Sequence, residues 1–243
     1  MRVIAIIQAR MGSTRLPGKV LMNILDRPML WHVVQRTCRA RLIDEVVVAT
    51  TSGEADEAIV SLCRSQDWPY FRGSEEDVLD RYYQTVRHYR ADVVVRITSD
   101  CPLIDSGVID RVIKAFINGQ PELDYASNTL PPRTFPRGLD TEVFSLSALE
   151  RAWREDTNPA SREHVTPYIY RHPEKFRLQG VSSDIDYSYM RWTVDTLEDL
   201  NFVRKIFEHF GNNAFSWREV LRMLDEHPEW LEINRHVQQK VVP

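Results

Sequence analysis

The sequence predicts an α/β fold, built on a mostly parallel sheet with helices on both of its faces. Three apolar runs support this prediction: residues 3–8, 45–50 and 92–98 are rich in Val and Ile and are continuous rather than alternating. Continuous runs are typical of strands that are buried on both faces. Amphipathic segments of helical length separate the runs, and this alternation indicates a parallel sheet.

Each strand in the first half is followed by a segment with the spacing of a helix. In residues 28–40, Met29, Val33 and Cys38 recur near helical spacing, and Pro28 suits a first helical turn. Ser74 is placed to cap the N-terminus of a later helix. The expected helices are 28–40, 54–66, 75–89 and 106–118, with a short strand at 68–71.

The pattern changes after Asp124. Residues 128–139 hold three of the thirteen prolines and two arginines, so this stretch cannot be a helix. No repeat or linker divides the chain, and we expect a single domain over 1–243 with an inserted arm at about 124–182 and C-terminal helices at about 196–237. The elements expected there are strands at 142–144 and 176–181, a short apolar run at 192–194, and helices at 146–154, 161–170, 197–210, 216–225 and 228–237.

The charge distribution is uneven along the chain. The net charge is only −4, which gives no sign of a nucleic-acid binder. Residues 1–41, however, carry eight basic side chains against Asp26 alone, so the remainder is strongly acidic. This basic segment is a first sign of an anionic ligand, although we read Arg36, Arg39 and Arg41 as the solvated face and C-terminal end of the first helix.

Several protein classes are excluded by composition. The apolar fraction of 43% and charged fraction of 27% are ordinary for a globular protein. Apolar runs are far shorter than the roughly 18–20 residues of a membrane span, and no signal-peptide pattern is visible. The three cysteines are scattered without a CxxC pair, so we expect neither a disulfide framework nor a zinc site. A cytoplasmic protein without membrane contact is the expectation.

The loop after the first strand, QARMGSTRLPGKVL at 8–21, suits a polyphosphate. Gly12 and Gly18 permit close backbone approach, and Arg10, Arg15 and Lys19 supply positive charge. A Walker A loop is excluded, because five residues separate the glycines and no Ser or Thr follows the lysine. The dinucleotide motif GxGxxG is also absent.

Two acidic residues follow other predicted strands. Asp100 lies just past the 92–98 strand, and Asp195 follows the apolar run at 192–194. Carboxylates at that edge of a sheet, opposite a polyphosphate, are natural Mg²⁺ ligands, although a lone Asp there is also a common helix cap or turn residue. Cys101 is a soft ligand that does not suit Mg²⁺.

The loop resembles the nucleotide-binding signature of the CMP-sugar synthetases, the cytidylyltransferases for 3-deoxy-manno-octulosonate and acylneuraminate. Gln8 stands where those synthetases usually have proline, and this form resembles the spore coat polysaccharide F-type branch. The segments RITSDCPLI at 96–104 and VDTLEDL at 194–200 also resemble the family's acidic motifs. The ten matching loop positions are Ile7, Ala9, Arg10, Ser13, Arg15, Leu16, Pro17, Gly18, Lys19 and Leu21.

The resemblance implies a fold and a reaction. The fold would be Rossmann-like, of the nucleotide-diphospho-sugar transferase type, in a homodimer whose inserted arm reaches the neighbouring site. The reaction would transfer CMP from CTP to an acidic sugar of the 2-keto-3-deoxy type and release pyrophosphate, in surface polysaccharide or glycan biosynthesis. Asp100 and Asp195 would hold Mg²⁺ and act with Arg10 and Lys19 in catalysis. The implied nucleotide-binding residues are Ala9, Arg10, Gly12, Ser13, Arg15, Lys19, Arg81 and Ser99.

The acceptor side is less defined. An acidic sugar needs a cation for its carboxylate, and Arg is the bidentate choice. Arg137, Arg162 and Arg191 all qualify, and Asp140 and His164 lie in segments that resemble those of the spore coat branch. Three alternatives stay open: a nucleotidyltransferase for sugar 1-phosphates, a sugar-nucleotide glycosyltransferase and a non-catalytic paralogue.

Overall fold

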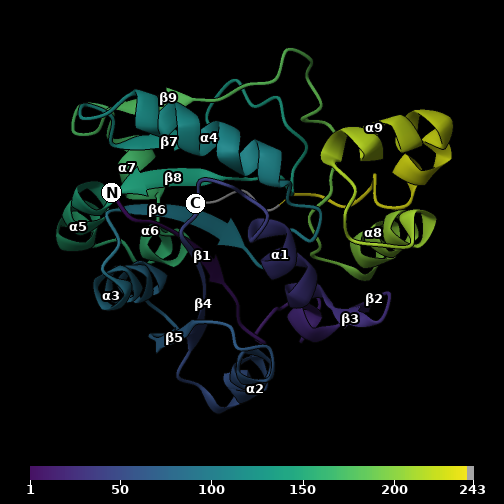
Figure 1. Ribbon diagram of the computed structural model, residues 1–243, viewed down its shortest axis with the longest axis horizontal. Helices are drawn as coiled ribbons and strands as arrows, with labels where there is room; N and C mark the ends of the chain where they lie inside the picture. The colour runs from purple at the N-terminus through teal and green to yellow at the C-terminus, as the bar shows by residue number, and fades with distance from the viewer. Residues whose placement is uncertain (240–243) are drawn as a thin grey trace.

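The computed structural model describes residues 1–239, which fold around one seven-stranded sheet (Figure 1). Along the sheet the strand order is β5, β4, β1, β6, β8, β7, β9, and β8 runs antiparallel to both of its neighbours. The remaining pairs are parallel, so the predicted mostly parallel sheet is confirmed. The strands are β1 (Val3–Gln8), β4 (Glu45–Thr51), β5 (Tyr70–Gly73), β6 (Val93–Thr98), β7 (Tyr125–Ser127), β8 (Glu142–Ser145) and β9 (Leu178–Gly180). A separate small ribbon pairs β2 (Asn23–Ile24) with β3 (Arg27–Pro28).

Helices cover both faces of the sheet, because its central strands are apolar on both sides. Along β1, Ala5 and Ile7 face one buried cluster and Ile4 and Ile6 face the other. The first cluster packs against α1 (Met29–Thr37), α2 (Glu57–Ser65), α4 (Ser106–Asn118), α8 (Leu197–Phe210) and α9 (Trp217–Glu226). The second packs against α3 (Val78–Tyr89), α5 (Leu146–Glu155) and α7 (Pro167–Arg171), beside α6 (Pro159–His164).

Most expected elements differ from the structure by a few residues at their ends, and three differ more clearly. Helix α3 begins at Val78 with Asp77 as its N-cap, whereas Ser74 caps only a turn by accepting from the backbone of Asp77. The expected helix at 161–170 is two short helices, because Val165 has a positive φ of 71°. The last expected helix is only a 3-10 turn at Pro228–Glu232 within the described residues.

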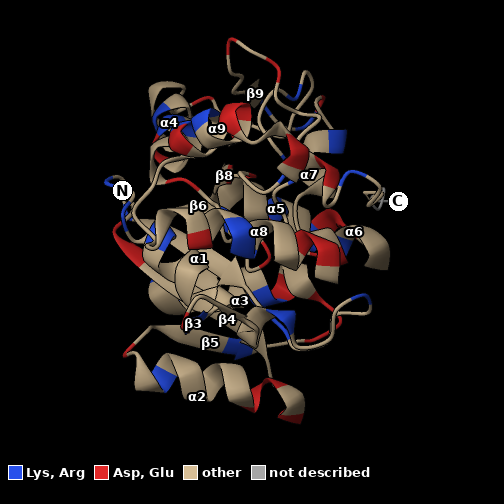
Figure 2. Cartoon of the chain, turned by 90° about the vertical axis from the view of Figure 1, so that its right-hand side faces the viewer, with Lys and Arg blue, Asp and Glu red and all other residues tan. Residues whose placement is uncertain are grey.

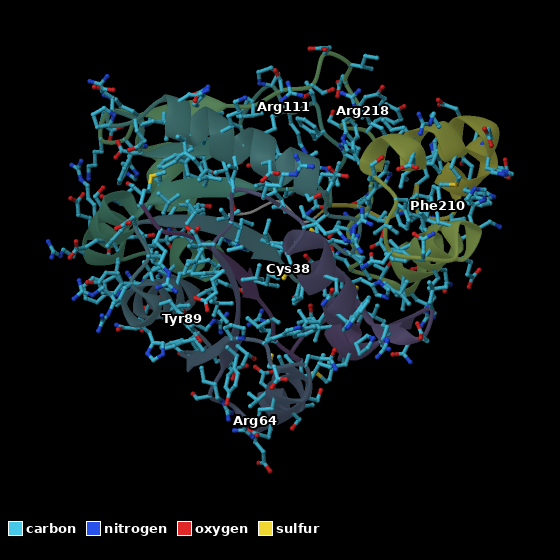
Figure 3. The ribbon with its side chains drawn as sticks, in the orientation of Figure 1. Cys38, Arg64, Tyr89, Arg111, Phe210 and Arg218 are labelled. Carbon is cyan, nitrogen blue, oxygen red and sulfur yellow. The ribbon has the colours of Figure 1, made fainter. Side chains whose placement is uncertain are left out.

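The segment expected as an inserted arm is part of the sheet. Residues 124–182 supply β7, β8, β9 and helices α5 to α7. Strand β8 lies between β6 and β7. Arg111 of α4, labelled in Figure 3, connects this helix to the segment. Its guanidinium lies over the Phe135 ring of the proline-rich loop and donates to the Ser182 carbonyl.

Basic and acidic residues are mixed along the elements. In Figure 2, positions of Lys and Arg alternate with positions of Asp and Glu over the elements in that view. Arg36 is a correction to the solvated face expected from sequence: it is 2% exposed and joins α1 to the C-terminal helices. Among the described residues, no helix combines the length and the apolar character that a membrane crossing requires.

Candidate active site

A cleft of about 660 Å³ opens at the edge of the sheet where β1 and β6 end. The two strands are parallel neighbours with Gln8 opposite Thr98, so the loops after them leave the same edge. Residues from the first loop, from the turn after β6 and from 193–195 therefore line one cleft, although they are far apart in sequence. This is the position at which ligands bind in open α/β sheets.

The loop after β1 has a fixed backbone. The amide groups of Ser13 and Gly18 both donate to the Met11 carbonyl, at 2.9 and 3.0 Å. Gly18 has a φ of 70°, a conformation that glycine adopts without strain. The Met11 amide in turn donates to the buried carboxylate of Asp56 at 2.7 Å. The loop is therefore tied to the turn after β4 and presents its cations from a preformed backbone.

Lys19 joins the two predicted metal ligands. Its Nζ donates to Asp100 Oδ2 at 3.0 Å and to Asp195 Oδ1 at 2.9 Å, residues 81 and 176 positions away in sequence. A third bond, of 2.7 Å, goes to the Val194 carbonyl. Burial opposes the charged form of Lys19, but the two carboxylates outweigh it and raise the pKa of the ammonium. Asp100 shows the converse effect. Burial raises the pKa of its carboxyl, but the Lys19 ammonium lowers that pKa by more, so that the net pKa is below the usual range.

Asp195 is surrounded by cations. Arg15 Nη2 lies 2.9 Å and Arg191 Nη2 lies 2.7 Å from its Oδ2 atom. Arg191 also pairs with the buried Asp199, whose carboxylate accepts from the backbone amide of Asp195 at 2.9 Å. Asp199 thus fixes both the position of Asp195 and the guanidinium beside it.

The carboxylates suit a divalent cation. Oxygens of Asp100 and Asp195 converge on one ammonium, so the site already holds one positive charge between two hard donors. Within residues 1–239 no cluster of three or more His, Cys, Asp or Glu side chains is placed to hold a metal. Mg²⁺ usually takes one or two carboxylates and completes its shell with phosphate oxygens and water, and Asp100 with Asp195 matches such a donor set.

The other predicted nucleotide-binding residues line the same cleft. Arg10 forms a 3.2 Å ion pair with Glu163 on α6, and both side chains are partly exposed. The Arg81 side chain is buried and donates to the Ser74 carbonyl at 2.9 Å, while its Nε has no hydrogen-bond partner among residues 1–239. Ala9, Gly12, Ser13 and Ser99 complete this group of predicted residues in the cleft lining.

The predicted acceptor residues separate into two groups. Arg137, Asp140 and His164 line the cleft, whereas Arg162 and Arg191 do not. Arg162 is held outside it by Asp77, at 2.7 and 2.9 Å, and by two backbone carbonyls. Arg137, in contrast, forms no ion pair with any carboxylate of the described chain.

The sequence and the fold of the chain were compared with those of known proteins, and they match a family. The cytidylyltransferase family matches residues 4–228 of the chain. The chain belongs to the cytidylyltransferase family. A spore coat polysaccharide biosynthesis protein of Bacillus subtilis is 32% identical over 93% of the chain and 95% of its own length. The structure of a cytidylyltransferase from Leptospira borgpetersenii is similar with a TM-score of 0.92 and 34% identity, over 99% of both chains.

A more distant structure shares the fold. A CMP:2-keto-3-deoxy-manno-octonic acid synthetase, solved in complex with CTP, superposes with a TM-score of 0.67 at 19% identity, over 86% of this chain and 99% of that one. These similarities confirm the family resemblance, the fold and a nucleotidyltransferase activity for this enzyme.

The sequence did not single out three polar residues of this cytidylyltransferase that contribute to the site. Asp199 lies in the first turn of α8, where the sequence indicates no more than a favourable charge at a helix N-terminus, and it does form a capping box with Thr196. Its second role is to form an ion pair with Arg191, and no local sequence pattern indicates this contact. Arg96 and Glu142 form a buried ion pair between β6 and β8, and a charged residue within a strand that is otherwise apolar was the one available sign of it.

Proposed function

We propose that this cytidylyltransferase transfers CMP from CTP to an acidic sugar of the 2-keto-3-deoxy type and releases pyrophosphate. The observation that carries the proposal is Arg137, which forms no ion pair within the described chain and lines the same cleft as the two converging carboxylates Asp100 and Asp195. In such a sugar the attacking hydroxyl and the carboxylate share one carbon. A cation for the carboxylate must therefore lie close to the reacting centre.

Arg137 meets this requirement better than its rivals. It lies near Arg133, Asp140 and Arg191, and Arg191 contacts Asp195 directly. Burial and the neighbouring arginines lower the pKa of Arg137, and this unfavourable positive field is relieved when an anion binds. Asp140 pairs with Arg133 and leaves a carboxylate at the cleft wall for sugar hydroxyls. Arg191 acts as a positioning residue for Asp195.

The phosphate loop supplies the charge for the leaving group. Arg10, Arg15 and Lys19 would bind the β- and γ-phosphates and stabilise pyrophosphate as it leaves. Lys19 and Arg15 now contact carboxylates, so nucleotide binding requires them to exchange these partners for phosphate oxygens. Mg²⁺ held by Asp100 and Asp195 would neutralise phosphate charge and lower the pKa of the attacking hydroxyl.

The relatives support the wider setting of the proposal. The similarity to a spore coat polysaccharide biosynthesis protein favours a role in making a surface glycan. We further propose a cytoplasmic homodimer, in which the proline-rich loop at 128–139 contacts the neighbouring subunit.

The test measures pyrophosphate release with each of the four nucleoside triphosphates against a panel of 2-keto-3-deoxy sugar acids and sugar 1-phosphates. We expect turnover with CTP and an acidic acceptor. Asp100→Asn should lose nearly all turnover, whereas Arg137→Gln should raise the KM of the acid acceptor about tenfold or more and leave CTP binding intact. Turnover with sugar 1-phosphates alone would overturn the proposal.

A further inference from the structure

One wall of the cleft carries planar polar side chains that the proposed reaction does not use. Gln8 ends β1 and Arg96 lies in β6, and both side chains are on the α3 face of the sheet, as Ile6 and Val94 are. His164, at the end of α6, also lines the cleft, and its imidazole is close enough to Arg96 to be affected by the charge of the guanidinium. The carboxylates Asp100 and Asp195 belong to a different part of the lining, beside Lys19.

Arg96 is held rigidly. Its Nε donates to Gln8 Oε1 at 3.1 Å and its Nη1 pairs with Glu142. The other oxygen of Glu142 accepts from Tyr125 and Thr166, both at 2.6 Å. A buried ion pair that is this well satisfied fixes the guanidinium plane. Its side chain is 13% exposed, and Nη2, which bonds no described residue, is the nitrogen left to face the cleft.

The amide of Gln8 has only one possible orientation. A guanidinium can only donate, so the oxygen of Gln8 must face Arg96. The hydroxyl of Tyr82 lies 3.2 Å from the same oxygen. The amino group of Gln8 therefore points away from these two partners, and Gln8 lines the cleft. Together, Gln8 and Arg96 present two N–H donors from adjacent strands.

The charge on this wall favours a neutral ligand group. Arg96 is neutralised by Glu142, whereas Arg137 on the acceptor side is unpaired within the described chain. His164 is also suited to a neutral neighbour, because burial and the nearby Arg96 lower the pKa of its imidazole. Val78 and Arg81 of α3 line the cleft as well, so that a flat ring would meet apolar and guanidinium surface there.

We propose that Gln8 and Arg96 recognise the pyrimidine of the nucleotide by donating hydrogen bonds to its O2 and N3 atoms. This inference rests on the proposed function, in which the nucleotide is CTP. Cytosine offers acceptors at both positions, whereas uracil carries a hydrogen on N3 that would oppose the amino group of Gln8. The pair therefore selects CTP over UTP, because a mismatched buried polar pair costs binding free energy.

The experiment measures the dissociation constants of CTP and UTP by calorimetry, with Mg²⁺ and without an acceptor, so that no turnover occurs. Gln8→Met removes the donor at similar volume, and we expect CTP binding to weaken about tenfold while UTP binding changes little. Gln8→Glu keeps an oxygen for Arg96 and replaces the amino group by a second oxygen. It should reduce the preference for CTP further, because that oxygen accepts from N3–H of uracil.

Each other outcome has a definite meaning. An unchanged ratio of CTP to UTP affinity in a folded Gln8→Met protein would overturn the inference, and so would a raised acceptor KM with unchanged CTP binding. Failure of the wild-type enzyme to bind CTP at all would instead overturn the proposed function. The thermal midpoint of each variant checks that its fold is intact.

Discussion

A single ammonium group connects the phosphate loop with the acidic side of the site. Lys19 was expected at a phosphate, and in the structure its three hydrogen bonds go to Asp100, Asp195 and a backbone carbonyl. The ammonium therefore occupies the position between the two carboxylates at which a divalent cation would bind. In the proposed reaction, lysine and metal would therefore compete for the same two carboxylates until a nucleotide offers the lysine new partners.

This competition can be measured without turnover. In Lys19→Met, we expect Mn²⁺ to bind the nucleotide-free protein at least about tenfold more tightly than it binds the wild type, because one cation has left the site. Electron paramagnetic resonance of free Mn²⁺ gives the affinity. Adding Asp100→Asn to Lys19→Met is the control and should weaken binding again. Equal Mn²⁺ affinity in wild type and Lys19→Met would contradict the prediction, and in either case activity should be lost with the phosphate contact.

His32 makes stability depend on pH. Its imidazole is 2% exposed, and Nε2 donates to the Ile24 carbonyl at 2.8 Å. Burial, with a smaller effect from Arg36, lowers the pKa of His32 below 6.5, although Ile24 and Asp26 oppose the shift. The unfolded chain therefore binds the proton more readily than the folded protein, so stability falls as the pH drops below about 6.5.

We expect the free energy of unfolding, from urea titrations, to decrease between pH 7.5 and 5.5, and to decrease less in His32→Gln, which keeps a donor for Ile24. His209→Gln, at an exposed position, is the matched control. The same pH dependence in His32→Gln as in the wild type would show that other groups cause it.

Individual residues could be predicted from the sequence where their role depends on local context. The phosphate loop, Asp100 and Asp195 each follow a strand directly, and parallel strands bring such positions together. Arg162 could not be assigned in this way, because the residue that holds it, Asp77, is 85 positions away. The sequence indicated three arginines that could bind the acceptor carboxylate. Only the contacts in the structure show which of them forms no ion pair within the described chain.

At the scale of elements, the part of the cleft wall that carries Arg137 depends on one glycine. Gly138 has a φ of 108°, and a Cβ built on it would lie 2.6 Å from the backbone carbon of Trp192. At this point the loop crosses the 190–194 segment, where the Arg137 amide donates to the Met190 carbonyl and the Trp192 amide to the Arg137 carbonyl, at 3.0 and 2.7 Å. The crossing places Arg137 beside the cleft.

Gly138→Ala should therefore separate the two segments. We expect a loss of about 3 kcal/mol in unfolding free energy, because the methyl group meets backbone that cannot yield easily. In addition, the acceptor KM should rise more than the CTP dissociation constant, since Arg137 moves with the loop. Gly211→Ala, at a positive φ but with open space around it, is a control for backbone strain alone. A Gly138→Ala protein as stable as Gly211→Ala would contradict this account.

Elements with strong internal patterns were predicted well. The apolar runs became β1, β4 and β6, while the expected helix at 161–170 broke at Val165. The break has a local cause, because Pro167 suits the first turn of a new helix but lacks the amide hydrogen that a continuous helix would need. A tertiary contact accompanies it, since the hydroxyl of the cap residue Thr166 donates to the buried carboxylate of Glu142. Apolar periodicity alone therefore placed one helix where this proline divides two.

At the scale of the whole molecule, the basic N-terminal segment has two separate tasks. Arg10, Arg15 and Lys19 lie at the cleft, whereas the buried Arg36 joins α1 to the segment after β6 and to the loop between α8 and α9. Its Nε donates to the Ile104 carbonyl at 2.7 Å, and its two other nitrogens donate to the carbonyls of Asn213 and Phe215 at 3.1 and 2.9 Å. The total charge of a segment therefore overestimates the negative charge of the ligand that it can bind, because some guanidinium groups donate to buried carbonyls instead.

Arg36→Met tests whether this contact stabilises the entire fold. The substitution removes the side-chain donor of the Ile104 and Phe215 carbonyls and one of two donors to the Asn213 carbonyl, which Arg39 also contacts. We expect a loss of about 3 kcal/mol in unfolding free energy. For a domain of this size that corresponds to a fall of roughly 6–12 °C in the thermal midpoint, measured by calorimetry. Arg36→Lys, which keeps the charge but cannot bridge three separate carbonyls, should lie between Arg36→Met and the wild type.

Because α8 begins directly after Asp195, loosening of the C-terminal helices should also weaken CTP and Mg²⁺ binding near the midpoint but not well below it. A midpoint within about 1 °C of the wild type would show that the C-terminal helices are held by apolar packing alone.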